Sequence, residues 1–140
     1  MSHDRPSKNI SVREGPPPTW PETCREEVEA ILRRYPEGRE MSAILPLLHL
    51  AMREREGRYI TLADIEAVAE ICGVTPAYVD SVCSFYTMLK RQPIGKYLIT
   101  VCGNMTCQLL NGGDKLLEHM EQTLGIKAGE TTPDGLITLE

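Results

Sequence analysis

The pair Cys102-x-x-x-x-Cys107 is the feature of this sequence whose residue types and spacing are suited to chemistry. Thiolates are the ligands that iron–sulfur clusters require, because soft sulfur donates to iron and its negative charge balances the metal. Four intervening residues let two thiolates curl around one iron. Spacing alone leaves two interpretations open, namely two iron ligands or two inert thiols. A disulfide-exchange pair of the thioredoxin type would need Cys-x-x-Cys, so the longer gap disfavours that chemistry.

The other candidate ligands are predicted to be structural. Cys24, Cys72 and Cys83 lie on the apolar faces of predicted helices, where a free cysteine behaves as a small hydrophobic residue. His49 is expected to be a partly exposed or hydrogen-bonded helical residue, and His119 a surface residue. The sequence has no Ser/His/Asp set, phosphate-binding loop or HExxH motif.

The elements around the cysteine pair form a strand–loop–helix–strand unit. Apolar residues on both faces of 97–101 predict a buried strand that ends at Cys102, followed by a glycine-bearing loop over 102–107. A helix is expected from Gly112-Gly113-Asp114 to Gly125, and a second strand from Leu136. The residues expected on the inner face of that helix are Leu116, Leu117, Met120 and Leu124. Ligands bind at the carboxyl ends of strands in α/β sheets, which is where the cysteines fall.

Upstream, residues 20–92 predict a helical bundle, and residues 1–19 a disordered, proline-dotted tail. The first helix is expected to begin with a capping box at Thr23 and Glu26, and the second to start near Ser42. The third is expected to have its N-cap at Thr61, with Asp64 three positions on, and to stop at Gly73. The last helix has Thr75-Pro76 as its N-cap and first residue. The fold class is therefore α+β, a helical bundle followed by a small α/β unit.

Composition excludes several classes of protein. The 140 residues carry 15 basic and 20 acidic side chains, a net charge of −5, which disfavours binding that depends on phosphate contacts. No run approaches the roughly 20 apolar residues that a membrane-spanning helix needs. The first 19 residues lack the apolar core of a secretory signal, so we expect a cytoplasmic protein.

A helix-turn-helix rhythm over 62–86 raises DNA binding as an alternative. Residues 59–89 carry four acidic side chains and neither Lys nor Arg. Because a phosphate backbone would repel such a surface, the pattern is better explained by helix packing.

Several motifs resemble, in order and spacing, the thioredoxin-like 2Fe–2S subunit family of the bacterial NADH–quinone oxidoreductase, complex I. They are Arg34-Tyr35-Pro36, Leu45-Pro46-Leu47-Leu48, Ser84-Phe85-Tyr86-Thr87-Met88, Pro93-Ile94-Gly95-Lys96-Tyr97, Val101 to Cys107, and Leu124 to Gly135. The resemblance covers about residues 22–140. Related subunits serve NAD-reducing hydrogenases and NAD-dependent formate dehydrogenases.

The resemblance implies that 93–140 is the N-terminal part of a thioredoxin-like 2Fe–2S ferredoxin domain, truncated at its C-terminus. Cys102 and Cys107 would be two of four cluster ligands, and the other two are expected beyond residue 140. Such a subunit packs against the flavin-bearing, NADH-binding subunit and a neighbouring iron–sulfur subunit, on the cytoplasmic side of the inner membrane. FMN and NAD would be bound by the partner, and no nucleic acid and no membrane insertion are expected.

Three functions follow as hypotheses. The first is an electron-transfer subunit of an NADH:quinone oxidoreductase that carries a 2Fe–2S cluster and has no catalytic residue of its own. The second is a cluster-free docking module of the same or a related assembly. The third, disfavoured by charge, is a helix-turn-helix DNA-binding protein.

Overall fold

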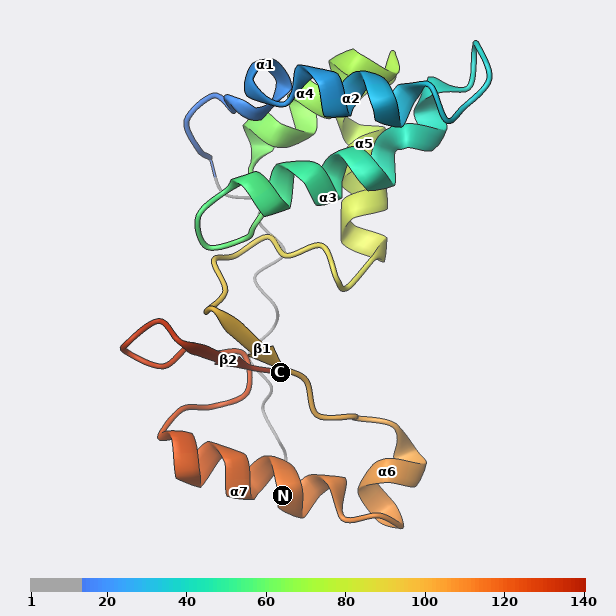
Figure 1. Ribbon diagram of the computed structural model, residues 1–140. Coiled ribbons are helices and arrows are strands. Elements are labelled where there is room, and N and C mark those ends of the chain that lie inside the picture. The colour runs from blue at the N-terminus through green and yellow to red at the C-terminus, as the bar shows by residue number, and fades with distance from the viewer. Residues whose placement is uncertain (1–13) are drawn as a thin grey trace. The chain divides into compact units, whose positions relative to one another are not determined.

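The structure of the protein is a computed structural model that describes residues 14–140 (Figure 1). Most of the expected N-terminal tail, residues 1–13, lies outside the described residues, and 14–18 form neither helix nor strand. The described chain divides into two compact units, a helical unit that ends at Pro93 and a cysteine unit, Ile94–Glu140. Seven α-helices and a two-stranded parallel sheet among the described residues confirm the expected α+β class.

The helical unit is built from short helices around one apolar core. Its elements are α1 (Trp20–Thr23), α2 (Arg25–Leu32), the 3-10 helix η1 (Glu40–Ala43), α3 (Ile44–Glu54), α4 (Leu62–Cys72) and α5 (Pro76–Phe85). Helix α3 packs against both α4 and α5 (Figure 1). Leu47, Leu48, Ile65, Val68 and Val79 are fully buried, which places the centre of the core among these three helices.

Local capping signals fix the later helices as the sequence predicts. Thr61 caps α4 and forms a reciprocal capping box with Asp64, and Gly73 ends that helix in the left-handed conformation. Thr75 caps α5, and its hydroxyl accepts a hydrogen bond from the amide of Tyr78. Each of these signals lies within four residues of the helix end that it sets.

The first predicted helix is wrong in its boundaries. Helix α1 begins at Trp20, ahead of the expected capping box, and α2 begins separately at Arg25. The hydroxyl of Thr23 donates to the carbonyl of Thr19 and does not cap a helix. The early start turns the indole of Trp20 inward, where it is 3% exposed.

A buried carboxylate joins α1 to the loop before α4. Asp64 is fully buried, and its Oδ1 accepts a hydrogen bond of 3.0 Å from Nε1 of Trp20. Its Oδ2 accepts from Nε and Nη2 of Arg55 at 3.1 and 2.9 Å, and from the amide and hydroxyl of Thr61 at 2.9 and 2.7 Å. A buried ionised carboxylate is costly unless it is paired in this way.

The cysteine unit has the predicted order of elements, with one addition. Strand β1 (Tyr97–Ile99) runs parallel to β2 (Ile137–Leu139), and α6 (Met105–Leu109) and α7 (Gly113–Leu124) lie between them in the chain (Figure 1). Residues 129–132 return along the other side of β2, with an antiparallel bridge between Thr131 and Thr138. Thus β2 has a neighbour on each side.

Two expectations about burial in this unit are wrong. The strand predicted to be buried is short and half-exposed, with Tyr97 58% exposed. Leu116, expected on the inner face of α7, is 52% exposed, whereas Leu117, Met120 and Leu124 are half-buried. The strand and α7 do carry the expected apolar residues, but within residues 94–140 too few elements pack against these side chains to bury them.

Among residues 14–140, no helix is long and apolar enough to cross a lipid bilayer.

Candidate functional site

Strand β1 places Cys102 at the end of the sheet. Parallel pairing sets Tyr97 opposite Ile137 and Ile99 opposite Leu139. The hydrogen bonds then continue past the strand, from the amide of Glu140 to the carbonyl of Ile99 at 2.8 Å and from the amide of Val101 to the carbonyl of Glu140 at 2.6 Å. Cys102 is therefore the first residue beyond the last ladder bond, and it is exposed.

A short helix then carries Cys107. Asn104 is the N-cap of α6, and its Oδ1 accepts a 3.0 Å hydrogen bond from the amide of Thr106. Cys107 is the third residue of α6 and is half-buried. The expected open loop over 102–107 is thus wrong in its second half, which is helical. The N-capping asparagine, three residues before the second cysteine, is the sequence signal that would have revealed this helix.

The two thiols contact each other. A hydrogen bond joins the side chains of Cys102 and Cys107, and the backbone N–H of Asn104 also points to the sulfur of Cys102. The Asn104 amide and, second, the Cys107 thiol hold the pKa of Cys102 below its usual range. The hydrogen bond to Cys102 raises the pKa of Cys107. The pKa values of the two thiols are therefore shifted in opposite directions, with that of Cys102 the lower.

Helix α7 approaches this pair so closely that a side chain at its start would crowd the backbone of the cysteines. A Cβ on Gly113 would lie 3.0 Å from the carbonyl oxygen of Cys107 and 3.4 Å from that of Cys102. Gly113 is the first residue of α7. Because Gly113 has no side chain, the first turn of α7 packs directly on the backbone of both cysteines.

The remaining cysteines are structural, most clearly the two that are buried. Cys72 and Cys83 are buried in the helical unit, as predicted, and Cys24 is half-buried. Burial raises the pKa of Cys72 to about 11 and raises the pKa of Cys83 as well. His49 and His119 are exposed.

The donor set fits half of an iron–sulfur ligand shell. Two thiols in mutual contact, one of them receiving a backbone N–H, suit two positions on one iron. Over residues 14–140, no three His, Cys, Asp or Glu side chains gather as a metal site would require. The described residues therefore offer two candidate thiol ligands, whereas a 2Fe–2S cluster needs four ligands.

Similarity to known proteins points the same way. Residues 28–140 match the family model of the thioredoxin-like [2Fe-2S] ferredoxins. An NADH-quinone oxidoreductase subunit of Mycobacterium tuberculosis H37Rv is 40% identical over 152 residues, which covers 96% of this chain and 58% of the relative. Another, from Rhizobium meliloti, is 44% identical over 117 residues, covering 84% of this chain and 67% of the relative.

A mitochondrial relative extends the comparison to eukaryotes. The NADH dehydrogenase [ubiquinone] flavoprotein 2 of Dictyostelium discoideum is 42% identical over 113 residues, 81% of this chain and 45% of that protein. This chain spans just over half the length of the Mycobacterium relative. The match to the family model covers most of the chain, including both cysteines of the pair, and the chain belongs to the thioredoxin-like [2Fe-2S] ferredoxin family.

Proposed function

We propose that the protein is an electron-transfer subunit of an NADH:quinone oxidoreductase and that Cys102 and Cys107 bind one iron of its 2Fe–2S cluster. The observation that carries the proposal is the contact between these two thiols, at the end of a strand, within a chain of this family. The other two thiolates would come from outside the described residues 14–140. The cluster, when bound, would accept and release one electron.

This chain's own residues would hold and tune the cluster. The N–H of Asn104 points to the sulfur of Cys102, and hydrogen bonds to ligand sulfurs shift the reduction potential. On α6 and just beyond it, Met105, Leu109 and Leu110 are each about three-quarters exposed. Covered by a partner, these apolar side chains would exclude water from the ligands.

The partner we propose is a flavin-bearing, NADH-binding subunit, with a further iron–sulfur subunit nearby, on the cytoplasmic side of the membrane. The support is that two of the relatives are named as NADH-quinone oxidoreductase subunits and the third as an NADH dehydrogenase flavoprotein. In the helical unit, Phe85 is 77% exposed and Met88 55% exposed, which suits a surface covered in an assembly. FMN and NAD would belong to that partner.

The test of cluster binding uses the protein expressed from its complete gene. We expect iron and acid-labile sulfide in equal amounts, visible absorption and an EPR signal on reduction, all of which Cys102→Ser or Cys107→Ser should abolish or alter. Cys72→Ser is the matched control and should leave the iron content unchanged, because Cys72 is buried elsewhere. A colourless protein after anaerobic reconstitution, with no difference between wild type and Cys102→Ser, would remove the proposal.

The close approach of Gly113 gives a second test. Gly113→Ala would push a methyl group against the Cys107 carbonyl and displace the ligand backbone. We expect the reconstituted protein to lose iron to a chelator about ten times faster, in the range of substitutions that support a ligand without contacting the metal. Lys115→Ala, an exposed change on the same helix, serves as the control. Equal rates for both variants would show that the approach of α7 does not position the ligands.

A further inference from the structure

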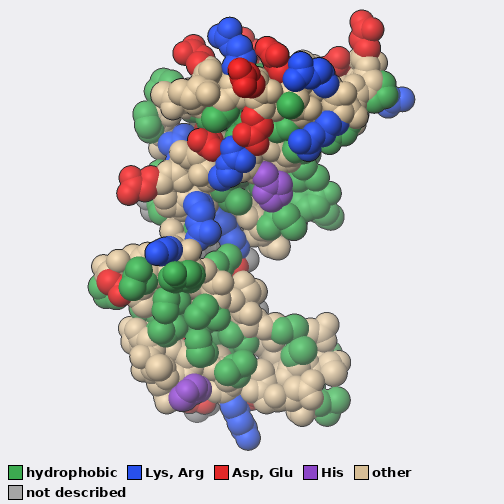
Figure 2. Space-filling model, viewed as in Figure 1, with side chains coloured by type: hydrophobic (Ala, Val, Ile, Leu, Met, Phe, Trp, Pro, Cys, Tyr) green, Lys and Arg blue, Asp and Glu red, His purple; other side chains and the backbone are tan. Residues whose placement is uncertain are grey.

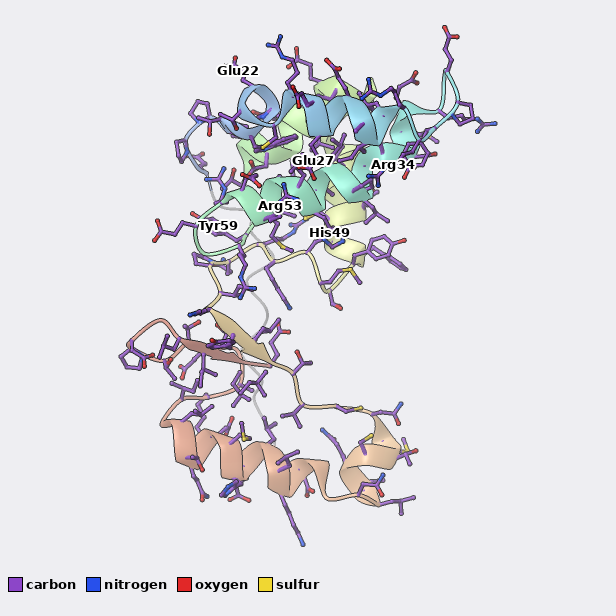
Figure 3. All side chains as sticks on the ribbon, viewed as in Figure 1. Glu22, Glu27, Arg34, His49, Arg53 and Tyr59 are labelled. Carbon is purple, nitrogen blue, oxygen red and sulfur yellow. The ribbon has the colours of Figure 1, made fainter. Side chains whose placement is uncertain are left out.

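The sequence contains one Asn-Gly dipeptide, Asn111-Gly112, and it lies in the turn between α6 and α7. Asn111 is exposed, and Figure 3 shows the side chains of this turn on the outside of the cysteine unit. When glycine follows asparagine, the backbone nitrogen of the glycine can reach the side-chain amide carbon, because glycine has no Cβ to shield that nitrogen. Asn111-Gly112 therefore has the residue types that undergo spontaneous chemical modification.

Both reacting groups of this dipeptide lack hydrogen-bond partners. Within residues 14–140, the backbone N–H of Gly112 donates no hydrogen bond, and the side chain of Asn111 neither donates nor accepts one. A hydrogen bond to either group would have to open before the nitrogen could approach the carbon. At Asn111-Gly112 the fold imposes no such step.

The dipeptide Asp134-Gly135 is a comparison within the same unit, because aspartate before glycine can cyclise by the same route. Here the N–H of Gly135 donates to the carbonyl of Thr132 at 2.8 Å. The carboxylate Oδ1 of Asp134 accepts from the amide of Leu136 at 3.0 Å and from the hydroxyl of Thr132. Gly112 and Gly135 have φ 68° and 71°. The φ of the glycine therefore does not distinguish the two dipeptides, whereas hydrogen bonding does.

We propose that Asn111 is a site of spontaneous deamidation and that hydrogen bonds protect Asp134 from the equivalent reaction. The backbone nitrogen of Gly112 forms a bond to Cγ of Asn111, and the bond from Cγ to the side-chain nitrogen breaks. That nitrogen leaves as ammonia with the proton of the Gly112 amide. Water then opens the succinimide ring at one of its two C–N bonds to the imide nitrogen. One opening gives aspartate and the other gives isoaspartate, with no change of oxidation state.

The products change a stretch of the cysteine unit that is otherwise uncharged. Residues 97–113 contain no Lys, Arg, Asp or Glu, and Figure 2 shows the surface over α6 without charged side chains on the face drawn. Either product adds a negative charge just before α7, and isoaspartate also lengthens the main chain by one carbon. Gly113, which packs on the backbone of both cysteines, follows two residues later. The altered backbone therefore lies next to the candidate ligands.

The experiment compares two Asn-Gly dipeptides in one protein. Asp134→Asn, expressed from the complete gene, places asparagine in the hydrogen-bonded turn. The folded protein is incubated in mildly alkaline buffer, and deamidation at positions 111 and 134 is followed by peptide mass spectrometry. Isoaspartate is identified by enzymatic methyl transfer from S-adenosylmethionine. We expect position 111 to react about 25-fold faster, because at 134–135 the side chain and the glycine amide must each leave a hydrogen bond, at a factor of about five each.

Three controls accompany this comparison. In concentrated urea, where neither turn is folded, the two positions should react at similar rates. Asn104 is followed by the larger Met105, and its Oδ1 accepts from the amide of Thr106, so it should stay unmodified in the folded chain. Asn111→Gln should stop a more acidic form from accumulating on anion exchange, since glutamine forms the corresponding larger ring slowly.

The wild-type chain gives a second comparison that does not depend on the folding of a variant. Rates at Asn111 that agree within about a factor of five between the folded and the unfolded chain support the inference. A larger slowing in the folded chain overturns it, and so do equal rates at positions 111 and 134 in folded Asp134→Asn. Neither comparison involves iron, so the result is independent of the proposed function.

Discussion

Replacing Asp64 by alanine is expected to lower the free energy of unfolding of the helical unit by about 3–5 kcal/mol. The variant removes a fully buried carboxylate and leaves its donors without an acceptor. The guanidinium of Arg55, whose side chain is only 15% exposed, would lose the partner that compensates its burial. The indole N–H of Trp20 would be left buried without its bond.

Urea unfolding followed by far-ultraviolet circular dichroism measures this loss. Glu66→Ala is the control, because Glu66 is an exposed acidic residue two positions further along α4, and its removal should change stability by no more than about 0.5 kcal/mol. A loss below about 1 kcal/mol for Asp64→Ala would contradict the view that this carboxylate holds the unit together.

Replacing Leu139 by alanine is expected to lower the free energy of unfolding of the cysteine unit by about 2–5 kcal/mol. Leu139 is fully buried in β2, and the only other buried residues within 94–140 are Gly95, Ile126 and Thr138. With so small a core, one large cavity removes much of the apolar contact that holds the sheet. The ladder bonds of Val101 and Glu140, which lead directly to Cys102, would open with it.

Amide hydrogen exchange at Val101 and Glu140 reports this opening. A loss of about 2 kcal/mol corresponds to about 30-fold faster exchange wherever exchange follows opening of the unit. Leu136→Ala is the matched control, since Leu136 is 45% exposed and the chemical change is the same. Similar exchange rates in the two variants would show that burial at position 139 does not hold the cysteine unit together.

Local signals allowed the later helices and the order of the cysteine unit to be predicted from sequence. Thr61 with Asp64, Gly73, and Thr75-Pro76 each act within four residues, so their effect does not depend on the rest of the fold. The cysteine pair was identified on the same basis, because its spacing and its place after a strand are properties of the sequence alone. Its ligand role remains a proposal.

Errors occur where distant residues decide the outcome. Trp20 lies 44 positions from Asp64, and no local sequence pattern predicts the hydrogen bond between them that holds α1 against the core. Helix α6 has five residues, too few for apolar periodicity to reveal, although Asn104 marks its start. The positive φ of Arg58 is likewise not predicted by the spacing of residues in the sequence.

The buried indole of Trp20 has a consequence for spectroscopy. Trp20 is the single tryptophan of the chain and is buried in the helical unit, so its fluorescence emission reports the state of that unit. Absorption of an iron–sulfur chromophore would report the other unit. Recording both signals during one titration would therefore show directly whether the two units unfold together or in separate steps.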